Sequence, residues 1–137
     1  MNSWYVGRLA SGLLIATALP AAAFAQAWIP GSEIAGQPIH VTTNGVTDTV
    51  VLTPGGQATI TSPSGTNVVN ATWTAANSQL CLINGAVQEC VPYAGPFQAG
   101  QPMTLTSSCG ASETWLAAST NAPPPPPPPA PRGERGR

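Results

Sequence analysis

The stretch IHVTTNGVTDTVVL, residues 39–52, decides the fold class of this chain. Branched apolar residues alternate with polar ones on both sides of Asn44-Gly45, a pair suited to the positive φ angles of a two-residue type I′ hairpin turn. With this loop, Val41 faces Asp48 across the hairpin. One face then carries the apolar set and is expected to lie in the core, namely Ile39, Val41, Val46, Val50 and Leu52.

The next turn contains Pro54-Gly55-Gly56, and its length can be predicted from the strand that follows. A loop of Pro54-Gly55 alone would put Ile60 on the threonine face of the hairpin. A three-residue loop instead pairs Val50 with Ile60, with a glycine at the left-handed position. Matching of apolar faces therefore predicts the longer loop.

Alternation of the same kind predicts further strands at residues 66–74, 79–83, 86–91, 102–107 and 113–118, and helical periodicity is absent from this part of the sequence. The stretch AGQPIHVTT, residues 35–43, is similar to AGQPMTLTS, residues 99–107, and we interpret both copies of this internal repeat as strand starts. Seven or eight short strands joined by turns predict an all-β domain, an antiparallel meander that forms a sandwich or a small barrel.

The first 25 residues have the layout of a secretory signal peptide. Arg8 precedes an apolar run over residues 9–19, Pro20 follows, and Ala23-Phe24-Ala25 supplies small residues at the cleavage site. The run is shorter than the roughly 20 residues of a membrane-spanning helix. We expect export, cleavage after Ala25, and a periplasmic or secreted mature protein without a membrane span.

The predicted domain, residues 26–122, has almost no basic side chains. The chain contains no lysine, and the domain has only His40 against four acids, which are Glu33, Asp48, Glu89 and Glu113. A surface without lysine or arginine cannot neutralise phosphates, so the composition excludes nucleic acid as a partner of the domain.

Residues 123–137 form a separate proline-rich tail. Seven prolines, then Ala130 and Pro131, predict a stiff polyproline II spacer of about 28 Å. Its tip, residues 132–137, carries Arg132, Arg135 and Arg137. A solvated end is the simpler interpretation, and the alternative is a cationic tip that binds an anionic surface of the envelope.

The cysteine positions predict a disulfide, because export allows oxidation. If Asn84-Gly85 forms the loop of the hairpin around it, Cys81 faces Gln88. If Gly85-Ala86 or residues 84–87 form the loop, Cys81 faces Cys90 at bonding distance. We predict the Cys81–Cys90 bond, with a bond from either one to Cys109 as the rival. Cys109 is otherwise left over, either free and buried or used in a dimer.

No catalytic, cofactor or metal site is predicted from the sequence. His40 lies among threonines, and Asp48 falls on the opposite face of the hairpin, so a Ser-His-Asp site lacks its orienting acid. Cys-x-x-Cys is absent. Two acids that face each other in a cleft would favour an enzyme, but no motif brings any two together. The large aromatic residues are expected in the core.

A tryptophan strand, a leucine-cysteine-leucine strand and a cysteine in the next strand occur between Ala71 and Cys90. This pattern of about twenty residues resembles uncharacterised small secreted β-proteins of GC-rich bacteria, and it carries over no catalytic residue. A more distant likeness is to periplasmic protease inhibitors of small barrel fold. We therefore expect a non-enzymatic exported module that binds an envelope or extracellular component, with an inhibitor of an exported enzyme as the alternative.

Overall fold

The computed structural model describes residues 27–123 of the chain. The predicted signal peptide and the three arginines of the tail lie outside the described residues. Within them, no helix is long and apolar enough to cross a membrane.

Eight antiparallel strands form one sheet, so the predicted all-β class is confirmed. The order of the strands across the sheet is β6-β5-β4-β3-β2-β1-β8-β7. Each strand therefore pairs with its neighbour in sequence, except that β8 also pairs with β1 and that β6 and β7 are the two edges. The strands are β1 (Pro38–Thr43), β2 (Val46–Thr53), β3 (Gln57–Thr61), β4 (Val68–Ala76), β5 (Gln79–Asn84), β6 (Val87–Pro92), β7 (Met103–Thr106) and β8 (Ser112–Ala117).

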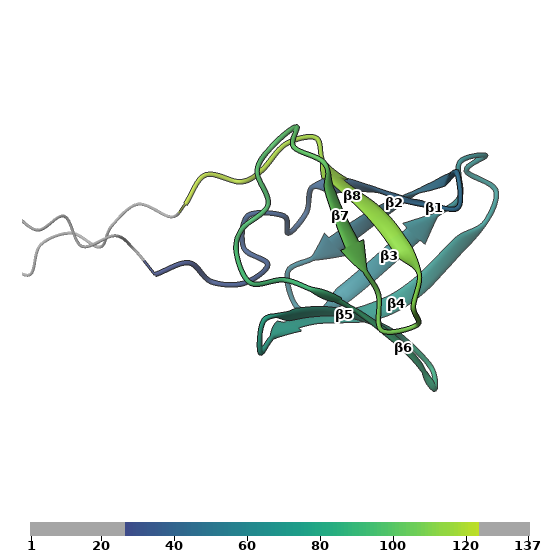
Figure 1. Ribbon diagram of the computed structural model, residues 1–137, viewed down its shortest axis with the longest axis horizontal. Coiled ribbons are helices and arrows are strands. Elements are labelled where there is room, and N and C mark those ends of the chain that lie inside the picture. The colour runs from purple at the N-terminus through teal and green to yellow at the C-terminus, as the bar shows by residue number, and fades with distance from the viewer. Residues whose placement is uncertain (1–26, 124–137) are drawn as a thin grey trace, which may run out of the picture.

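The sheet curls into a nearly closed barrel rather than a sandwich (Figure 1). One end of the barrel, here called the mouth, holds the connections at residues 44–45, 62–67, 85–86 and 107–111. The opposite end, here called the base, holds both ends of the described chain. The two ends of the barrel are therefore built from different parts of the sequence.

The register that the apolar pattern predicts is the one found. Val41 pairs with Asp48, and Asn44 and Gly45 both have positive φ, 50° and 80°. Val50 pairs with Ile60, which confirms the three-residue loop after β2. The two copies of the internal repeat also start strands, since they lead into β1 and β7.

Gly85-Ala86 forms the loop of the β5–β6 hairpin, which settles the alternatives left open by the sequence. Asn84 pairs with Val87, and Cys81 therefore faces Cys90 directly. The two cysteines form the predicted disulfide, while Cys109 is exposed and bonded to neither. The loop lies one residue after Asn84-Gly85, the pair with the stronger turn preference. The disulfide and the apolar face both favour the register with the later loop.

The barrel interior holds the side chains that alternate inward along the strands. Ile39, Leu52, Leu80 and Ala117 are fully buried or nearly so, and Trp115, Tyr93 and Phe97 lie with them in the core. Thr42, Thr47 and Thr49 lie on the outer face, as the hairpin pattern predicted. At the usual 25 cal/mol per Å² of apolar area, this interior is the main source of stability for a domain of this size.

A seam separates the two edge strands, since no backbone ladder joins β6 to β7. Ser108, in the connection after β7, bridges it near the mouth. Its N–H donates to the Cys90 carbonyl at 2.8 Å, and its hydroxyl accepts from the Cys90 N–H at 2.9 Å. One residue thus satisfies both backbone groups of Cys90, which point away from the β5 partner at a non-hydrogen-bonded pair.

Candidate functional site: the mouth of the barrel

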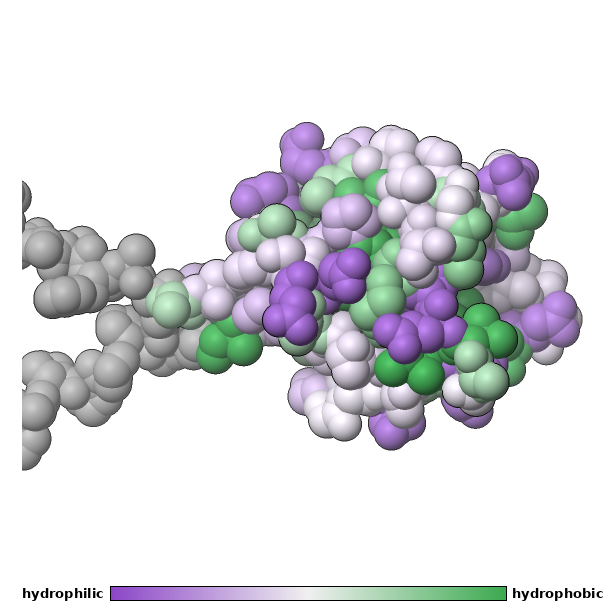
Figure 2. All heavy atoms as spheres, turned by 60° about the horizontal axis from the view of Figure 1, so that its bottom comes forward, coloured by the Kyte–Doolittle hydropathy of each residue, from purple (hydrophilic) through white to green (hydrophobic). Residues whose placement is uncertain are grey.

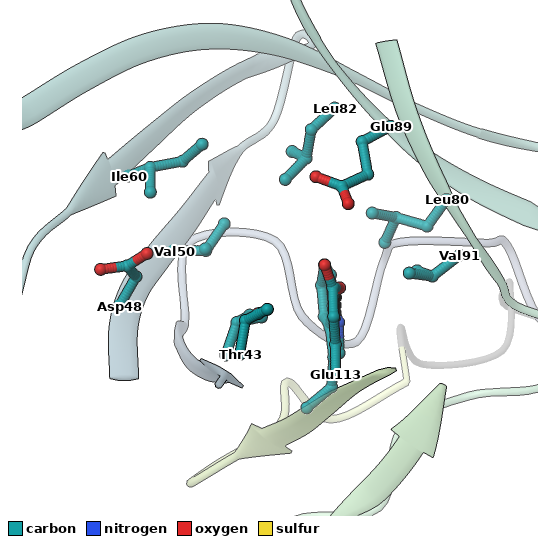
Figure 3. Close-up of a pocket in the computed structure, with 11 residues that line it drawn as sticks. Thr43, Asp48, Val50, Ile60, Leu80, Leu82, Glu89, Val91 and Glu113 are labelled. Carbon is teal, nitrogen blue, oxygen red and sulfur yellow. Dashed lines mark hydrogen bonds between the residues drawn. The ribbon is translucent and has the colours of Figure 1, made fainter. Parts of the chain in front are cut away.

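A cavity of about 120 Å³ opens among the inward side chains near the mouth (Figure 3). Its wall is mostly apolar, with Val41, Val50, Ile60, Leu80, Leu82, Val91 and Trp115, and its polar members are Thr43, Asp48, Glu89 and Glu113.

Three of the four acids of the domain line this cavity. Glu89 comes from β6 and Glu113 from β8, and their carboxyl groups both point into the space between these strands (Figure 3). Asp48, from β2, lies on another wall. In the described part of the chain, no three His, Cys, Asp or Glu side chains are grouped as metal ligands would be. The cavity is therefore acidic without the geometry of a metal site.

Glu113 is the acid most strongly affected by this position, because only 5% of its surface is exposed. The indole N–H of Trp115 donates to its Oε2 at 2.8 Å. Burial raises the pKa of the Glu113 carboxyl above its ordinary value of 4.5, and the nearby Glu89 carboxyl raises it further, whereas the Trp115 hydrogen bond lowers it. A buried acid with one donor and an acidic neighbour is poorly compensated.

Three exposed valines stand at the mouth end of the barrel. Val46, Val69 and Val87 are 53%, 40% and 67% exposed, although each follows the inward alternation of its strand. They stand at the mouth ends of β2, β4 and β6, beyond the reach of the core. Figure 2 shows hydrophobic surface next to hydrophilic surface at the right-hand end of the molecule. We call these three residues the valine rim.

The base contains the fourth acid, Glu33, in a different setting. Its carboxylate accepts hydrogen bonds from the Trp28 indole at 2.9 Å, from the Phe97 N–H at 3.0 Å, and from the Tyr93 hydroxyl. Burial, and then the bond to Glu33, raise the pKa of Tyr93, so its hydroxyl keeps the proton it donates. Glu33 is thus a structural carboxylate.

An aromatic column joins the two ends of the barrel. Trp28, Tyr93, Phe97 and Trp115 follow one another with ring centroids 5.1, 5.3 and 6.0 Å apart. Tyr93 donates to Glu33 at the base, and Trp115 donates to Glu113 at the mouth. The expectation that the aromatics lie in the core is confirmed for Tyr93, Phe97 and Trp115, while Trp28 is half-buried.

The residues weighed as chemical candidates in the sequence do not meet. His40 lies on the outer face, 3.5 Å from the Thr49 hydroxyl, and Asp48 lines the cavity inside. The pairing of Glu89 with Glu113 was missed. A sequence pattern could have predicted these acids, because each lies two positions before an inward apolar residue near the start of a strand. The three cases are Asp48 before Val50, Glu89 before Val91, and Glu113 before Trp115.

Comparison of this chain with known protein families, with curated proteins and with solved structures finds no match.

Proposed function

We propose that this chain is an exported, non-enzymatic β-barrel module that binds a partner in an envelope or extracellular space through the mouth of the barrel. The observation that carries the proposal is the Glu89–Glu113 pair in one cavity, at the end of the barrel where the valine rim is exposed. The disulfide and the lack of a spanning helix in residues 27–123 are compatible with export.

The chemistry of the mouth favours a cationic group on an apolar stem. Glu89, Glu113 and Asp48 line the cavity, and no lysine or arginine occurs in residues 27–123 to compensate them. A guanidinium or ammonium would pair with the carboxylates, while the methylenes of the same side chain would contact the valine rim. The mouth therefore matches the two halves of an arginine or lysine side chain.

The volume favours a side chain over a free substrate. Pockets for drug-sized ligands measure about 300–1,000 Å³, and the cavity measures about 120 Å³. Two facing carboxyl groups are also what an enzyme of acid–base type needs. This pair, however, stands in a space with room for little more than the group that neutralises it. We therefore place binding before catalysis.

An inhibitor of an exported enzyme is the second candidate, and one observation favours it. The β5–β6 hairpin is braced by the disulfide and presents the exposed Val87 beside its tip. A rigid, protruding hairpin loses little entropy on binding. The segment before β1 does not offer such a protrusion, because Trp28 and Glu33 are bonded to each other and Glu33 is buried.

Site-directed photo-crosslinking on the full chain, expressed in a host that exports it, tests the proposal. A photoreactive residue at Val87 probes the mouth, and one at Thr47, on the outer face, is the matched control. We expect crosslinked products from Val87 in the envelope or extracellular fraction and their loss in the E89Q/E113Q variant. Products from Thr47 alone, or a chain retained in the cytoplasm, would contradict the proposal.

A further inference from the structure

We infer that the mouth of one molecule binds the arginine tip, residues 132–137, of a second copy of this chain, so that the molecules associate head to tail. This inference rests on the proposed function and names the occupant of the mouth. The site is the apolar cavity with its valine rim, and the sign of its charges selects the occupant. Besides Arg8 of the predicted signal, the only basic side chains of lysine or arginine type in the chain are Arg132, Arg135 and Arg137.

The base fixes the place where the tail begins. Asn121 donates its backbone N–H to the Glu33 carbonyl at 2.7 Å. Its side-chain amide donates to the carbonyls of Ser32 and Ala35 and accepts from Gln37 at 2.7 Å. Four hydrogen bonds therefore hold Asn121 at the base, two residues before Pro123, at the end of the barrel opposite to the mouth (Figure 1).

The sequence after Asn121 predicts a spacer too stiff to reverse its own direction. Each residue from 122 to 128, and also Ala130, precedes a proline, which confines it to extended conformations. The chain is thus expected to run about 28 Å from the base before Arg132. Six further residues span at most about 20 Å. A strand of six residues alone covers about 20 Å of barrel. At the end of a straight spacer directed away from the base, a tip of this length would not reach its own mouth.

The mouth of a second molecule is free of this restriction. A spacer that leaves the base and points away carries its cationic tip toward a neighbour without any reversal. A guanidinium entering the cavity would form charge-assisted hydrogen bonds with Glu89 and Glu113, and its stem would contact the rim. Because the two surfaces are different, the contact is heterologous and generates chains or rings rather than a closed symmetric dimer.

Two complementary variants test the inference in sedimentation velocity of the exported full-length protein. The tip variant is R132A/R135A/R137A, and the mouth variant is E89Q/E113Q. We expect the parent to associate increasingly with concentration, and each variant alone to lower the association constant at least about tenfold, which corresponds to 1.4 kcal/mol. A mixture of the two should form heterodimers and nothing larger, because it retains one working mouth and one working tip.

The controls separate this contact from other modes of association. V87R places a positive charge, the same sign as that of the arginine tip, on an exposed rim residue. It should therefore block assembly even if E89Q/E113Q fails to fold. C109S removes the exposed free thiol outside both surfaces and should leave assembly intact. A parent that stays monomeric, a mixture that does not associate, or assembly that C109S abolishes would overturn the inference. Mouth crosslinks to another component with a monomeric parent would leave the proposed function standing.

Discussion

The two ends of the barrel each bury a glutamate, and the surroundings of these two side chains differ in almost every respect. Glu33 at the base is 8% exposed and accepts hydrogen bonds from three donors. Glu113 at the mouth is as buried, has one donor, and faces a second carboxyl group. A buried carboxylate with converging donors holds a fold together, whereas one without them is available to a ligand.

Replacing Glu33 with alanine should have the largest effect on stability. It leaves the Trp28 indole, the Tyr93 hydroxyl and the Phe97 N–H without their acceptor, and each hydrogen bond to a charged group contributes about 1.5–3 kcal/mol. We expect a loss of at least about 3 kcal/mol in the free energy of unfolding, measured by urea denaturation. E33Q, which keeps the shape, should lose less. A loss below about 1 kcal/mol for E33A would remove the contrast between the two ends.

Removal of the disulfide comes next. The bond closes a loop between residues nine positions apart, for which chain entropy predicts roughly 2.5 kcal/mol. The C81S/C90S variant should therefore unfold at lower denaturant concentration by this amount, and C109S should match the parent within about 0.5 kcal/mol. Peptide mapping without reductant checks the pairing. A Cys109-containing bond within one chain would show that the mouth hairpin is held in another way.

At the mouth, E113Q should stabilise the protein at neutral pH, because burial and the neighbouring Glu89 disfavour the charged form of the Glu113 carboxyl. The pKa of Glu113 is raised in the folded state, so the folded protein binds the proton more tightly than the unfolded chain. Its contribution to stability is therefore fully present below the unfolded pKa and is lost as pH rises through the folded value. The midpoint temperature of thermal unfolding should fall as the pH rises from 4 to 8 in the parent, and it should fall less in E113Q.

Deletion of residues 124–137 should have the smallest effect on stability. The four hydrogen bonds of Asn121 remain, so the base stays closed, and we expect a change within about 0.5 kcal/mol. Self-association of the protein should be lost in this variant, and that of the parent should weaken with salt, because exposed charges act over about 8–10 Å. Undiminished association of the deletion variant at low salt would show that the arginine tip contributes nothing to binding.

The sequence predicted those parts of the fold that depend on neighbouring strands. The register of β1 with β2 and the loop after Thr53 follow from alternation on two strands joined by a short turn. The direct facing of Cys81 and Cys90 was one of several alternatives and was preferred on disulfide geometry. Choosing between a sandwich and a barrel was beyond this reasoning. The pairing of β8 with β1 links residues 70 to 78 positions apart, and no turn geometry predicts it.

The candidate site was missed for the same physical reason. Glu89 and Glu113 lie on β6 and β8, which do not pair in the sheet and are separated in the chain by β7 and by the long connection before it. Their approach depends on closure of the barrel, which alternation within a strand cannot show. The position of each acid on an inward face was nevertheless readable, as it was for Asp48 opposite Val41.

The seam between β6 and β7 has a consequence for solubility. An unpaired strand edge is a template on which other chains can add strands and start aggregation. Here the edge strand β7 has four residues, β6 ends in Pro92, and Ser108 occupies both backbone groups of Cys90. These three devices leave little edge open to an incoming strand. The barrel therefore leaves few backbone groups for amyloid-like strand addition, although its ring of backbone hydrogen bonds is not closed.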